Sequence, residues 1–176
     1  EKLPPMLCLS NGVDNEPAIA AALGADKVIY GTVTTAIGRR GVGDIVLEKL
    51  RGIGIADGHL LSGKLVAVFN AAFLNAQLFS SGLSMKWSKM LTNLIANPAS
   101  AILDLTAAQV FANRKLYKLE IQMLRECLAV MKAQNIEVVD LPKTPVRALA
   151  FATRLPLWLS KPLLGRAAGS GRGAKM

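Results

Sequence analysis

The pattern of apolar residues changes close to residue 84, and this change limits the possible folds more than any other feature of the sequence. Before it, short runs rich in Val, Ile and Thr are separated by glycines and by short helical stretches. After it, apolar residues recur at steps of three and four, as they do in amphipathic helices. We therefore predict a sheet-containing part at residues 1–81 and an all-helical part at residues 82–176.

The first part is predicted to alternate strands with helices, which is typical of a parallel sheet. Val, Ile, Thr and Tyr favour strands, while Gly and Pro mark the ends of elements. In chain order we expect a strand at 5–9, a helix at 16–24, a strand at 27–37, a hairpin formed by 44–50 and 53–56, a helix from its N-cap Ser62 to about Asn75, and a strand at 76–80.

One long amphipathic helix is predicted from about Asn113 to Gln134. Its apolar residues recur at three- and four-residue steps, and they are Leu116, Leu119, Met123, Leu124, Cys127, Leu128 and Met131. Thr106 is the expected N-cap of a shorter helix before it. The residues after Pro142 mix prolines with short apolar pieces, and residues 169–176 are predicted to form a loop.

The charge of the chain favours an anionic partner. The formal net charge is +9, with Lys and Arg spread along the chain and denser only near its end. Nucleic-acid-binding proteins ordinarily show a basic stripe with interleaved aromatic residues or a known binding module, and this sequence shows neither. We therefore expect an anionic metabolite or cofactor and no nucleic acid. A basic surface that contacts only solvent is the alternative.

The sequence predicts neither a membrane protein nor a secreted one. The longest apolar run, residues 65–74, is interrupted by Asn70 and has about half the length that a bilayer requires. The N-terminus lacks the pattern of a signal peptide. Cys8 and Cys127 each lie in apolar surroundings and are predicted to be buried free thiols, with a disulfide as the less favoured alternative. A cytoplasmic protein is expected.

Three polar side chains, Lys89, Asn93 and Asn97, stand four residues apart in an otherwise apolar helical segment. This spacing places them on one face of a helix, although Pro98 predicts a kink at Asn97. Desolvation in a cleft lowers the pKa of a lysine toward the working pH, where the ammonium is a better proton donor. One cation and two amides suit a ligand with hydroxyl, carbonyl and carboxylate groups. Alternatively, Lys89 reaches solvent and both amides bond to the backbone.

A complete dinucleotide-binding domain begins with a strand, a G-x-G-x-x-G turn and a helix. The glycine-rich run at residues 38–43, GRRGVG, has a different spacing and lies between predicted strands. The first part is therefore predicted to be the second half of such a domain. His59, the only histidine, has no second ligand nearby in the sequence, and no metal site is expected.

Four segments match motifs that occur in the same order in one protein family. They are 9–16, LSNGVDNE; 86–102, KWSKMLTNLIANPASAI; 125–138, RECLAVMKAQNIEV; and 170–176, SGRGAKM. The second resembles the pattern W-x-K-L-x-x-N-x-x-x-N-P that opens the C-terminal domain of ketopantoate reductases (2-dehydropantoate 2-reductases). The first resembles the N-G-x-x-N-E loop of the same family, the third a later helix, and the fourth the approach to a substrate-binding loop.

The resemblance implies a fold with two parts. An α/β part, the C-terminal half of a Rossmann-like sheet domain, precedes an all-α substrate domain similar to the C-terminal domain of 6-phosphogluconate dehydrogenase. The implied reaction is the NADPH-dependent reduction of ketopantoate, a 2-keto acid, to pantoate in pantothenate biosynthesis, with a cleft between the two parts. A homodimer through the helical part is compatible with this resemblance.

The resemblance also implies roles for individual residues. Lys89 matches the general acid that protonates the ketone oxygen, and Asn93 and Asn97 match amides that hold hydroxyl and carboxylate groups of the substrate. Asn11 matches a loop residue between the nicotinamide ribose and the substrate, and so binds both. Ile37, at the end of the second predicted strand, matches a backbone contact to the cofactor.

The sequence departs from the family pattern in ways that leave alternatives open. Ala107 stands where the family often has another substrate-contacting Asn, so a different 2-keto acid is an alternative substrate. The glycine-rich turn expected before residue 1 and a Ser and a Glu expected after Met176 are absent. We therefore expect an incomplete enzyme that is inactive alone. A non-catalytic helical interaction or dimerisation module is the alternative from another functional class.

Overall fold

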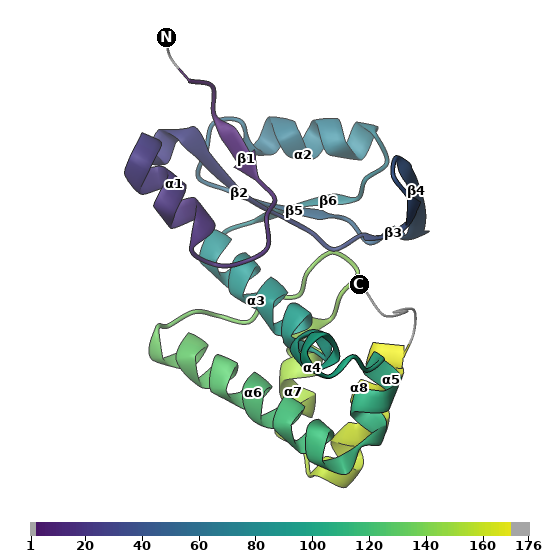
Figure 1. The fold of residues 1–176 in the computed structure, drawn as a ribbon. Coiled ribbons are helices and arrows are strands. Elements are labelled where there is room, and N and C mark those ends of the chain that lie inside the picture. The colour runs from purple at the N-terminus through teal and green to yellow at the C-terminus, as the bar shows by residue number, and fades with distance from the viewer. Residues whose placement is uncertain (1–2, 170–176) are drawn as a thin grey trace. The chain divides into compact units, whose positions relative to one another are not determined.

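The computed structural model describes residues 3–169, which fold into two compact units (Figure 1). The sheet unit comprises the residues up to 90 together with 139–144, and the helical unit comprises 91–138 and the residues from 145 onward. The boundary expected near residue 81 falls at the start of helix α3 (Gly82–Leu94). The boundary between the two units instead lies inside α3, between Met90 and Leu91, because the first part of this helix packs in the sheet unit.

The sheet unit contains a four-stranded sheet with the order β1 (Met6–Cys8), β2 (Val28–Val33), β5 (Ile53–Ala56) and β6 (Ala76–Phe79). β1 is parallel to β2, and β5 is parallel to β6, but β5 runs antiparallel to β2. Helix α1 (Asn15–Leu23) and the 3-10 turn Ala25–Lys27 connect β1 to β2, and α2 (Ser62–Ala71) connects β5 to β6. The predicted alternation of strands and helices is confirmed, although the sheet is mixed rather than parallel.

Isoleucines of the central strands and apolar residues of α2 form the core of the sheet unit. The buried strand residues are Ile29, Ile53 and Ile55, and the residues that α2 packs against them are Leu65, Val66 and Phe69. The α2 residues follow a helical spacing, so one side of the helix covers the sheet. This core holds the strand ends from which the loops of the candidate site begin.

A separate hairpin differs from the sequence-based prediction. β3 (Ala36–Gly41) pairs with β4 (Asp44–Lys49) in an antiparallel two-stranded sheet. The prediction of one strand over 27–37 is therefore wrong, and so is the pairing of 44–50 with 53–56. The second of those two runs is β5 and belongs to the four-stranded sheet.

Two threonines explain why β2 stops before the hairpin. Thr34 Oγ1 donates to the carbonyl oxygen of Gly52 at 3.1 Å, and the amide of Gly52 donates to Thr35 Oγ1 at 3.0 Å. The backbone amide of Thr34 still donates to the carbonyl oxygen of Gly52 at 3.0 Å. The amide of Gly52, however, bonds to the Thr35 hydroxyl and not to a backbone carbonyl, which is how threonine competes with a regular ladder. The chain leaves the sheet at this point and forms β3.

The segment 139–144 belongs to the sheet unit although it follows the long helix of the other unit. The amide of Val139 donates to Ser88 Oγ of α3 at 2.9 Å, and Thr34 Oγ1 donates to the carbonyl oxygen of Pro142 at 3.1 Å. The side chains of Ser88 and Thr34 are both buried. Buried hydroxyl groups need such partners, so these bonds fix the returning segment in the sheet unit.

Within the described residues, the helical unit contains only helices, as the three- and four-residue spacing of its apolar residues predicts. After the end of α3 it contains α4 (Asn97–Leu103), α5 (Ala107–Ala112), α6 (Arg114–Ala133), α7 (Val146–Ala152) and α8 (Leu157–Gly169). α6 confirms the long helix predicted at 113–134. Thr106 is confirmed as the N-cap of α5, where its hydroxyl accepts from the amide of Gln109 and the Gln109 side chain bonds back to Thr106.

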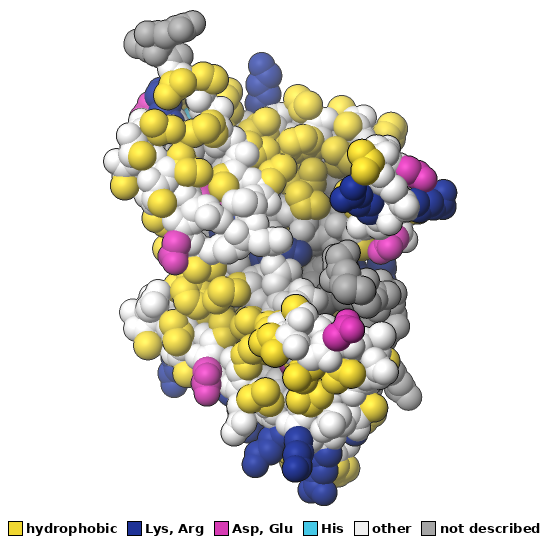
Figure 2. Space-filling model, in the orientation of Figure 1, with side chains coloured by type: hydrophobic (Ala, Val, Ile, Leu, Met, Phe, Trp, Pro, Cys, Tyr) yellow, Lys and Arg dark blue, Asp and Glu magenta, His cyan; other side chains and the backbone are white. Residues whose placement is uncertain are grey.

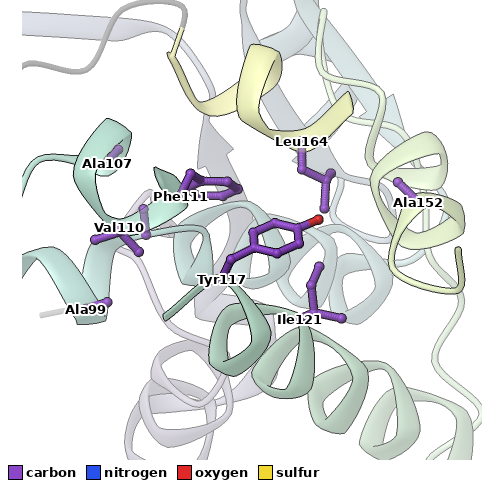
Figure 3. Packing of buried hydrophobic residues seen from close by; sticks show 9 residues of the cluster. Ala99, Ala107, Val110, Phe111, Tyr117, Ile121, Ala152 and Leu164 are labelled. Atoms are coloured by element: carbon purple, nitrogen blue, oxygen red, sulfur yellow. The ribbon is translucent and has the colours of Figure 1, made fainter. Parts of the chain in front are cut away.

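Aromatic and aliphatic residues from α4, α5, α6, α7 and α8 form the core of the helical unit (Figure 3). Phe111 of α5 and Tyr117 of α6 lie with ring centroids 5.5 Å apart in a tilted arrangement. Ile121, Ala152 and Leu164 complete the surroundings of the Tyr117 ring. The Tyr117 hydroxyl, buried in this cluster, donates to Ser160 Oγ of α8 at 2.6 Å. A buried hydroxyl is therefore satisfied within an apolar core.

Replacing Tyr117 with phenylalanine is expected to lower the free energy of unfolding by about 1 kcal/mol, because a buried hydrogen bond to Ser160 is lost while the ring keeps its packing. Chemical denaturation measures this change. In the background of Ser160→Ala, the same Tyr117→Phe substitution should have a different effect. Equal effects in both backgrounds would show that the two hydroxyl groups do not interact.

The end of the chain and one predicted cap differ from expectation. Residues 146–152 and 157–169 form α7 and α8, although the sequence there suggests only short apolar pieces between prolines. Pro145 lies at the N-cap of α7, where no backbone donor is required.

Ser62 does not cap α2, since Leu61 is its N-cap and the Ser62 hydroxyl donates to the carbonyl oxygen of Ala56. The motif at 170–176 lies outside the described residues.

Both cysteines are free thiols, as predicted. Cys127 is buried, whereas Cys8 is only half-buried, and the burial of Cys127 raises the pKa of its thiol.

Between residues 3 and 169, no helix combines the length and the apolar character that a bilayer span requires.

Candidate active site

Helix α3 carries two of the predicted site residues, Lys89 and Asn93. They are four residues apart, so they lie on the same side of the helix about one turn from each other. Both are half-buried. The continuous helix confirms that Lys89 and Asn93 share one helix face, as the sequence predicts.

Asn97 is not on the same helix. α3 ends at Leu94, Ala96 adopts a left-handed conformation with φ of 59°, and Asn97 begins α4 with Pro98 directly after it. The prediction of one continuous face for all three polar residues is therefore wrong. Pro98 has no amide hydrogen to continue the helix, so the expected kink is a complete break between two helices.

A buried glutamate of α6 holds this break. Glu120 Oε2 accepts a hydrogen bond from the amide of Ala96 at 2.7 Å, and the Glu120 side chain is 2% exposed. Burial raises the pKa of the Glu120 carboxyl, while the bond from Ala96 acts in the opposite direction. Glu120 thereby fixes the turn from which Asn97 begins. Sequence reasoning missed it, although Glu120 stands between Tyr117 and Ile121 on the apolar side of α6.

Glu120→Ala is expected to lower the free energy of unfolding by about 1–3 kcal/mol, since it leaves the buried amide of Ala96 without an acceptor. Glu126→Ala, at an exposed position of the same helix, is the matched control and should change stability by less than about 0.5 kcal/mol. Chemical denaturation of both variants measures the difference. Equal stability losses would contradict the role of Glu120.

The raised pKa of Glu120 also predicts a pH dependence. The folded protein holds the proton more tightly than the unfolded chain, whose carboxyl has a pKa near 4.5, so the Glu120 contribution falls as pH rises from there through the folded-state pKa. Glu120→Gln keeps an acceptor but cannot ionise. We expect the stability of Glu120→Gln relative to the unmodified protein to increase over this range, and denaturation at several pH values measures it. A constant difference would contradict the prediction.

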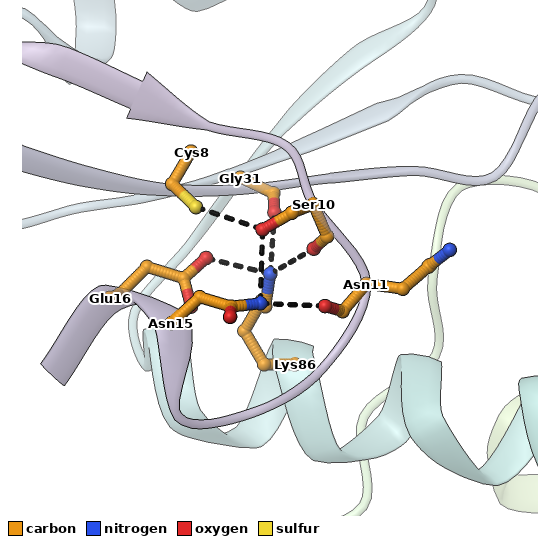
Figure 4. A network of polar contacts seen from close by, with 7 residues as sticks. All are labelled: Cys8, Ser10, Asn11, Asn15, Glu16, Gly31 and Lys86. Atoms are coloured by element: carbon orange, nitrogen blue, oxygen red, sulfur yellow. Dashed lines mark hydrogen bonds and ion pairs between the residues drawn. The ribbon is translucent and has the colours of Figure 1, made fainter. Parts of the chain in front are cut away.

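Asn11 lies in the exposed loop that follows β1, at the carboxyl end of a strand parallel to its neighbour. Asn15, the first residue of α1, holds this loop: its Nδ2 donates to the carbonyl oxygen of Asn11 at 2.6 Å and to Ser10 Oγ at 3.0 Å. In Figure 4 the Asn11 side chain points away from these contacts. Ligands of open α/β sheets bind outside the carboxyl ends of parallel strands, so the loop has a suitable place for a cofactor contact.

A buried ion pair lies directly beneath the Asn11 loop (Figure 4). Lys86 Nζ is 2.6 Å from Glu16 Oε1, and the two side chains are 1% and 0% exposed. Lys86 Nζ also donates to the carbonyl oxygens of Ser10 at 2.6 Å and Gly31 at 3.3 Å. Glu16 and Lys86 both lie within segments that match the family motifs, but the sequence alone did not predict a role for either residue. The signal available in the sequence was a lysine between Met85 and Trp87 in a segment predicted to be helical.

Two further expected positions lie in different surroundings from those predicted. Ile37 lies within β3, paired with Leu47, rather than at the end of β2, and it is half exposed. Ala107 is buried in the hydrophobic cluster of the helical unit, where an asparagine amide would need a buried partner.

Among residues 3–169 there is no cluster of three or more His, Cys, Asp or Glu side chains that could bind a metal ion.

Comparison with known proteins links this chain to one family. Residues 83–155 match the family described as "Ketopantoate reductase PanE/ApbA C terminal". That range contains Lys89, Asn93 and Asn97. Comparison with curated protein sequences gives no match.

Solved structures share the fold at low sequence identity. A PanE/ApbA family ketopantoate reductase from Ralstonia eutropha JMP134 has a TM-score of 0.70 and 18% identity, covering 96% of this chain and 67% of its own. The 2-dehydropantoate 2-reductase from Methylococcus capsulatus gives 0.66 and 22%, covering 94% and 54%. D-mandelate dehydrogenase with NADH and anilino(oxo)acetate gives 0.68 and 20%, covering 87% and 49%.

The chain spans about half the length of the latter two proteins and two thirds of the first. Like them, it combines strands of a Rossmann-like sheet with a helical domain. The family match begins within α3 and ends after α7, at residue 155. Residues 83–155 thus match the C-terminal domain of the ketopantoate reductase family, and the chain shares the fold of the solved ketopantoate reductases.

Proposed function

We propose that the natural protein containing this chain reduces a 2-keto acid to a 2-hydroxy acid with a nicotinamide cofactor, and that ketopantoate is the substrate. The observation that carries this proposal is the position of Lys89 and Asn93, one turn apart on a helix within the matched family domain. The ligands named for the similar structures, NADH and anilino(oxo)acetate, support a nicotinamide cofactor and a substrate with adjacent carbonyl groups.

The residues present suit the nicotinamide end of the cofactor. Asn11 lies at the carboxyl end of β1, in a loop whose backbone is fixed by Asn15. We propose that Asn11 contacts the nicotinamide ribose and the substrate. The cofactor, when bound, supplies the hydride. We propose NADPH as the cofactor. NADH is the alternative, and an assay with each of the two cofactors distinguishes them. The backbone of Ile37, in β3, is a weaker proposed cofactor contact.

Lys89 is the proposed proton donor. As negative charge develops on the ketone oxygen of the substrate, the Lys89 ammonium stabilises it by a hydrogen bond and transfers a proton to form the hydroxyl group. Asn93 and Asn97 are proposed to hold the hydroxyl and carboxylate groups of the substrate. Since Asn97 begins α4, the Glu120 contact with Ala96 fixes the backbone from which this amide projects. The net charge of +9 favours an anionic substrate such as a keto acid.

A substrate panel tests this proposal. The natural full-length protein is supplied with NADPH or NADH and with ketopantoate, phenylglyoxylate, pyruvate or 2-ketoisovalerate, and cofactor oxidation is followed by absorbance. We expect the highest kcat/KM with ketopantoate and NADPH. Highest activity with another 2-keto acid would contradict ketopantoate as the substrate. No oxidation with any of them would contradict a 2-keto acid reductase.

Exposed apolar side chains on the helical unit favour a second role, self-association. Phe151 of α7 is 62% exposed and Trp158 of α8 is 74% exposed. Figure 2 shows hydrophobic side chains on the visible surface of this unit. Large exposed apolar groups often mark contacts between chains, and we propose a homodimer through the helical unit.

Trp158→Glu is expected to shift the protein toward monomer, because a charge at a buried interface position loses its hydration. Light scattering after size-exclusion chromatography measures the mass, with Lys118→Glu, an exposed position on α6, as the control. A monomer at all concentrations of the unmodified protein would contradict the dimer.

A further inference from the structure

We propose that Lys86 and Glu16 are positioning residues for Asn11: their buried ion pair holds the Ser10–Asn11 loop in the conformation that presents Asn11 to the nicotinamide and the substrate. This inference rests on the proposed function and adds to it two residues that contact neither ligand. All of the groups involved belong to the sheet unit.

The position of the Lys86 ammonium is fixed from three elements. It pairs with Glu16 of α1 at 2.6 Å, and it donates to Ser10 of the loop at 2.6 Å and to Gly31 of β2 at 3.3 Å. An ammonium group has three hydrogens, and here each has an acceptor. The contact with Ser10 acts on the carbonyl group directly before Asn11, so it controls the peptide that precedes the proposed ligand-binding residue.

Stability alone does not account for charged residues at this place. Burying two charges costs desolvation energy, and well-packed apolar residues of similar volume are often as stabilising as a buried ion pair. An apolar residue at position 86, however, would leave the carbonyl oxygen of Ser10 and the buried carbonyl oxygen of Gly31 without this donor. The lysine therefore specifies a loop conformation, and Glu16 balances its charge.

A second contact fixes the same loop from its other side. Asn15, adjacent to Glu16 in α1, donates to the carbonyl oxygen of Asn11 and to Ser10 Oγ. Both backbone carbonyls around the Ser10–Asn11 junction are thus held by side chains of α1 and α3. Gly12 follows with φ of 106°, a conformation that residues with a side chain rarely adopt, and turns the chain back toward α1. The backbone is fixed while the Asn11 side chain points away from the ion pair (Figure 4).

Lys86 and Lys89 have separate roles despite lying three residues apart on α3. The Lys86 side chain is 1% exposed and its ammonium is surrounded by acceptors of the sheet unit, so it acts through the loop. Lys89 is half-buried and lies four residues before Asn93, one of the proposed substrate ligands. Only Lys89 is proposed to reach the reacting carbonyl group.

The test uses the double variant Glu16→Met/Lys86→Met, which leaves no unpaired buried charge and is expected to fold. Hydrogen–deuterium exchange of the 176-residue chain compares amides 11–14 with amides of α6 as an internal reference. We expect the loop amides to exchange at least tenfold faster and the α6 amides to be unchanged. The control Asp26→Ala/Lys27→Met removes an ion pair of which Asp26 is largely exposed, and it should leave both sets unchanged. Unchanged loop exchange in the Glu16/Lys86 variant would overturn the inference.

Kinetics of the natural full-length protein separate positioning from a purely structural role. In the folded Glu16→Met/Lys86→Met variant we expect KM for NADPH and for ketopantoate to rise at least fivefold, with a smaller fall in kcat because Lys89 is retained. Unchanged KM values alongside faster loop exchange would overturn the inference as well. Absence of turnover in the unmodified protein contradicts the proposed function instead, and the exchange experiment then decides alone whether the pair holds the loop.

Discussion

Lys89→Ala in the natural full-length protein is expected to lower kcat for 2-keto acid reduction by about 10²–10⁴-fold, the usual contribution of a positioned general acid. The alanine variant cannot donate a proton to the developing alkoxide. It also removes the positive charge that stabilises this oxygen in the transition state. Binding of the nicotinamide cofactor does not involve Lys89 in the proposed arrangement, so KM for NADPH should change little.

The variant is compared with Lys118→Ala, which removes a lysine from an exposed position of α6. Lys118→Ala should retain the unmodified kcat, and both variants should unfold at similar denaturant concentrations. Steady-state oxidation of NADPH with saturating ketopantoate measures kcat. A Lys89→Ala protein that keeps more than half of the unmodified kcat would contradict the assignment of the general acid. It would favour the alternative in which the Lys89 ammonium reaches solvent.

Lys86→Met is expected to lower the free energy of unfolding by about 3–5 kcal/mol, because it leaves the Glu16 carboxylate buried without its partner. Glu16 is fully buried, so water cannot replace the lost ammonium without opening the structure. The substitution also removes the donor to the carbonyl oxygens of Ser10 and Gly31. This is the largest stability effect that we expect from a single substitution in the sheet unit.

The double variant Glu16→Met/Lys86→Met should recover most of the loss and lie within about 1–2 kcal/mol of the unmodified chain, since neither buried charge remains. Lys27→Met, at a pair in which Asp26 is exposed, is the matched single substitution and should cost less than about 1 kcal/mol. Urea denaturation followed by circular dichroism measures the unmodified chain, Glu16→Met, Lys86→Met, the double variant and Lys27→Met. Additive effects of Glu16→Met and Lys86→Met would show that the two side chains do not interact energetically.

The elements that the sequence predicts well are those whose signals are local. The apolar residues of α6 recur at three- and four-residue steps along the helix, and the Thr106 and Gln109 pair at the start of α5 is a complete capping box. The strand at 76–79 is a short β-prone run next to turn residues. In each case the residues that stabilise the element are neighbours in the sequence.

The features that sequence reasoning missed depend on contacts between distant residues. Glu16 and Lys86 are far apart in the chain, and their pairing follows from the packing of α1 and α3 in the sheet unit. The contact between Glu120 and Ala96 requires α6 to pack beside the end of α3. A charged residue on the apolar side of a helix indicates that it has a buried partner, but the sequence does not show which residue that partner is.

Asn97 shows how one local rule can override another. The four-residue spacing of Lys89, Asn93 and Asn97 predicts a common helix face, whereas Pro98 predicts a break. The structure follows the proline, and the left-handed Ala96, held by Glu120, separates the helices. The candidate site therefore has Lys89 and Asn93 on α3 and Asn97 at the start of α4, in a geometry that spacing alone does not predict.

The most direct test of the proposed reaction is the stoichiometry of product formation. The natural full-length protein is incubated with ketopantoate and NADPH, and the pantoate formed is quantified by chromatography against the NADPH consumed, with Lys89→Ala in parallel. The account predicts one pantoate for each NADPH oxidised by the unmodified protein and almost none by Lys89→Ala. NADPH oxidation without pantoate, or equal pantoate formation by both proteins, would contradict it.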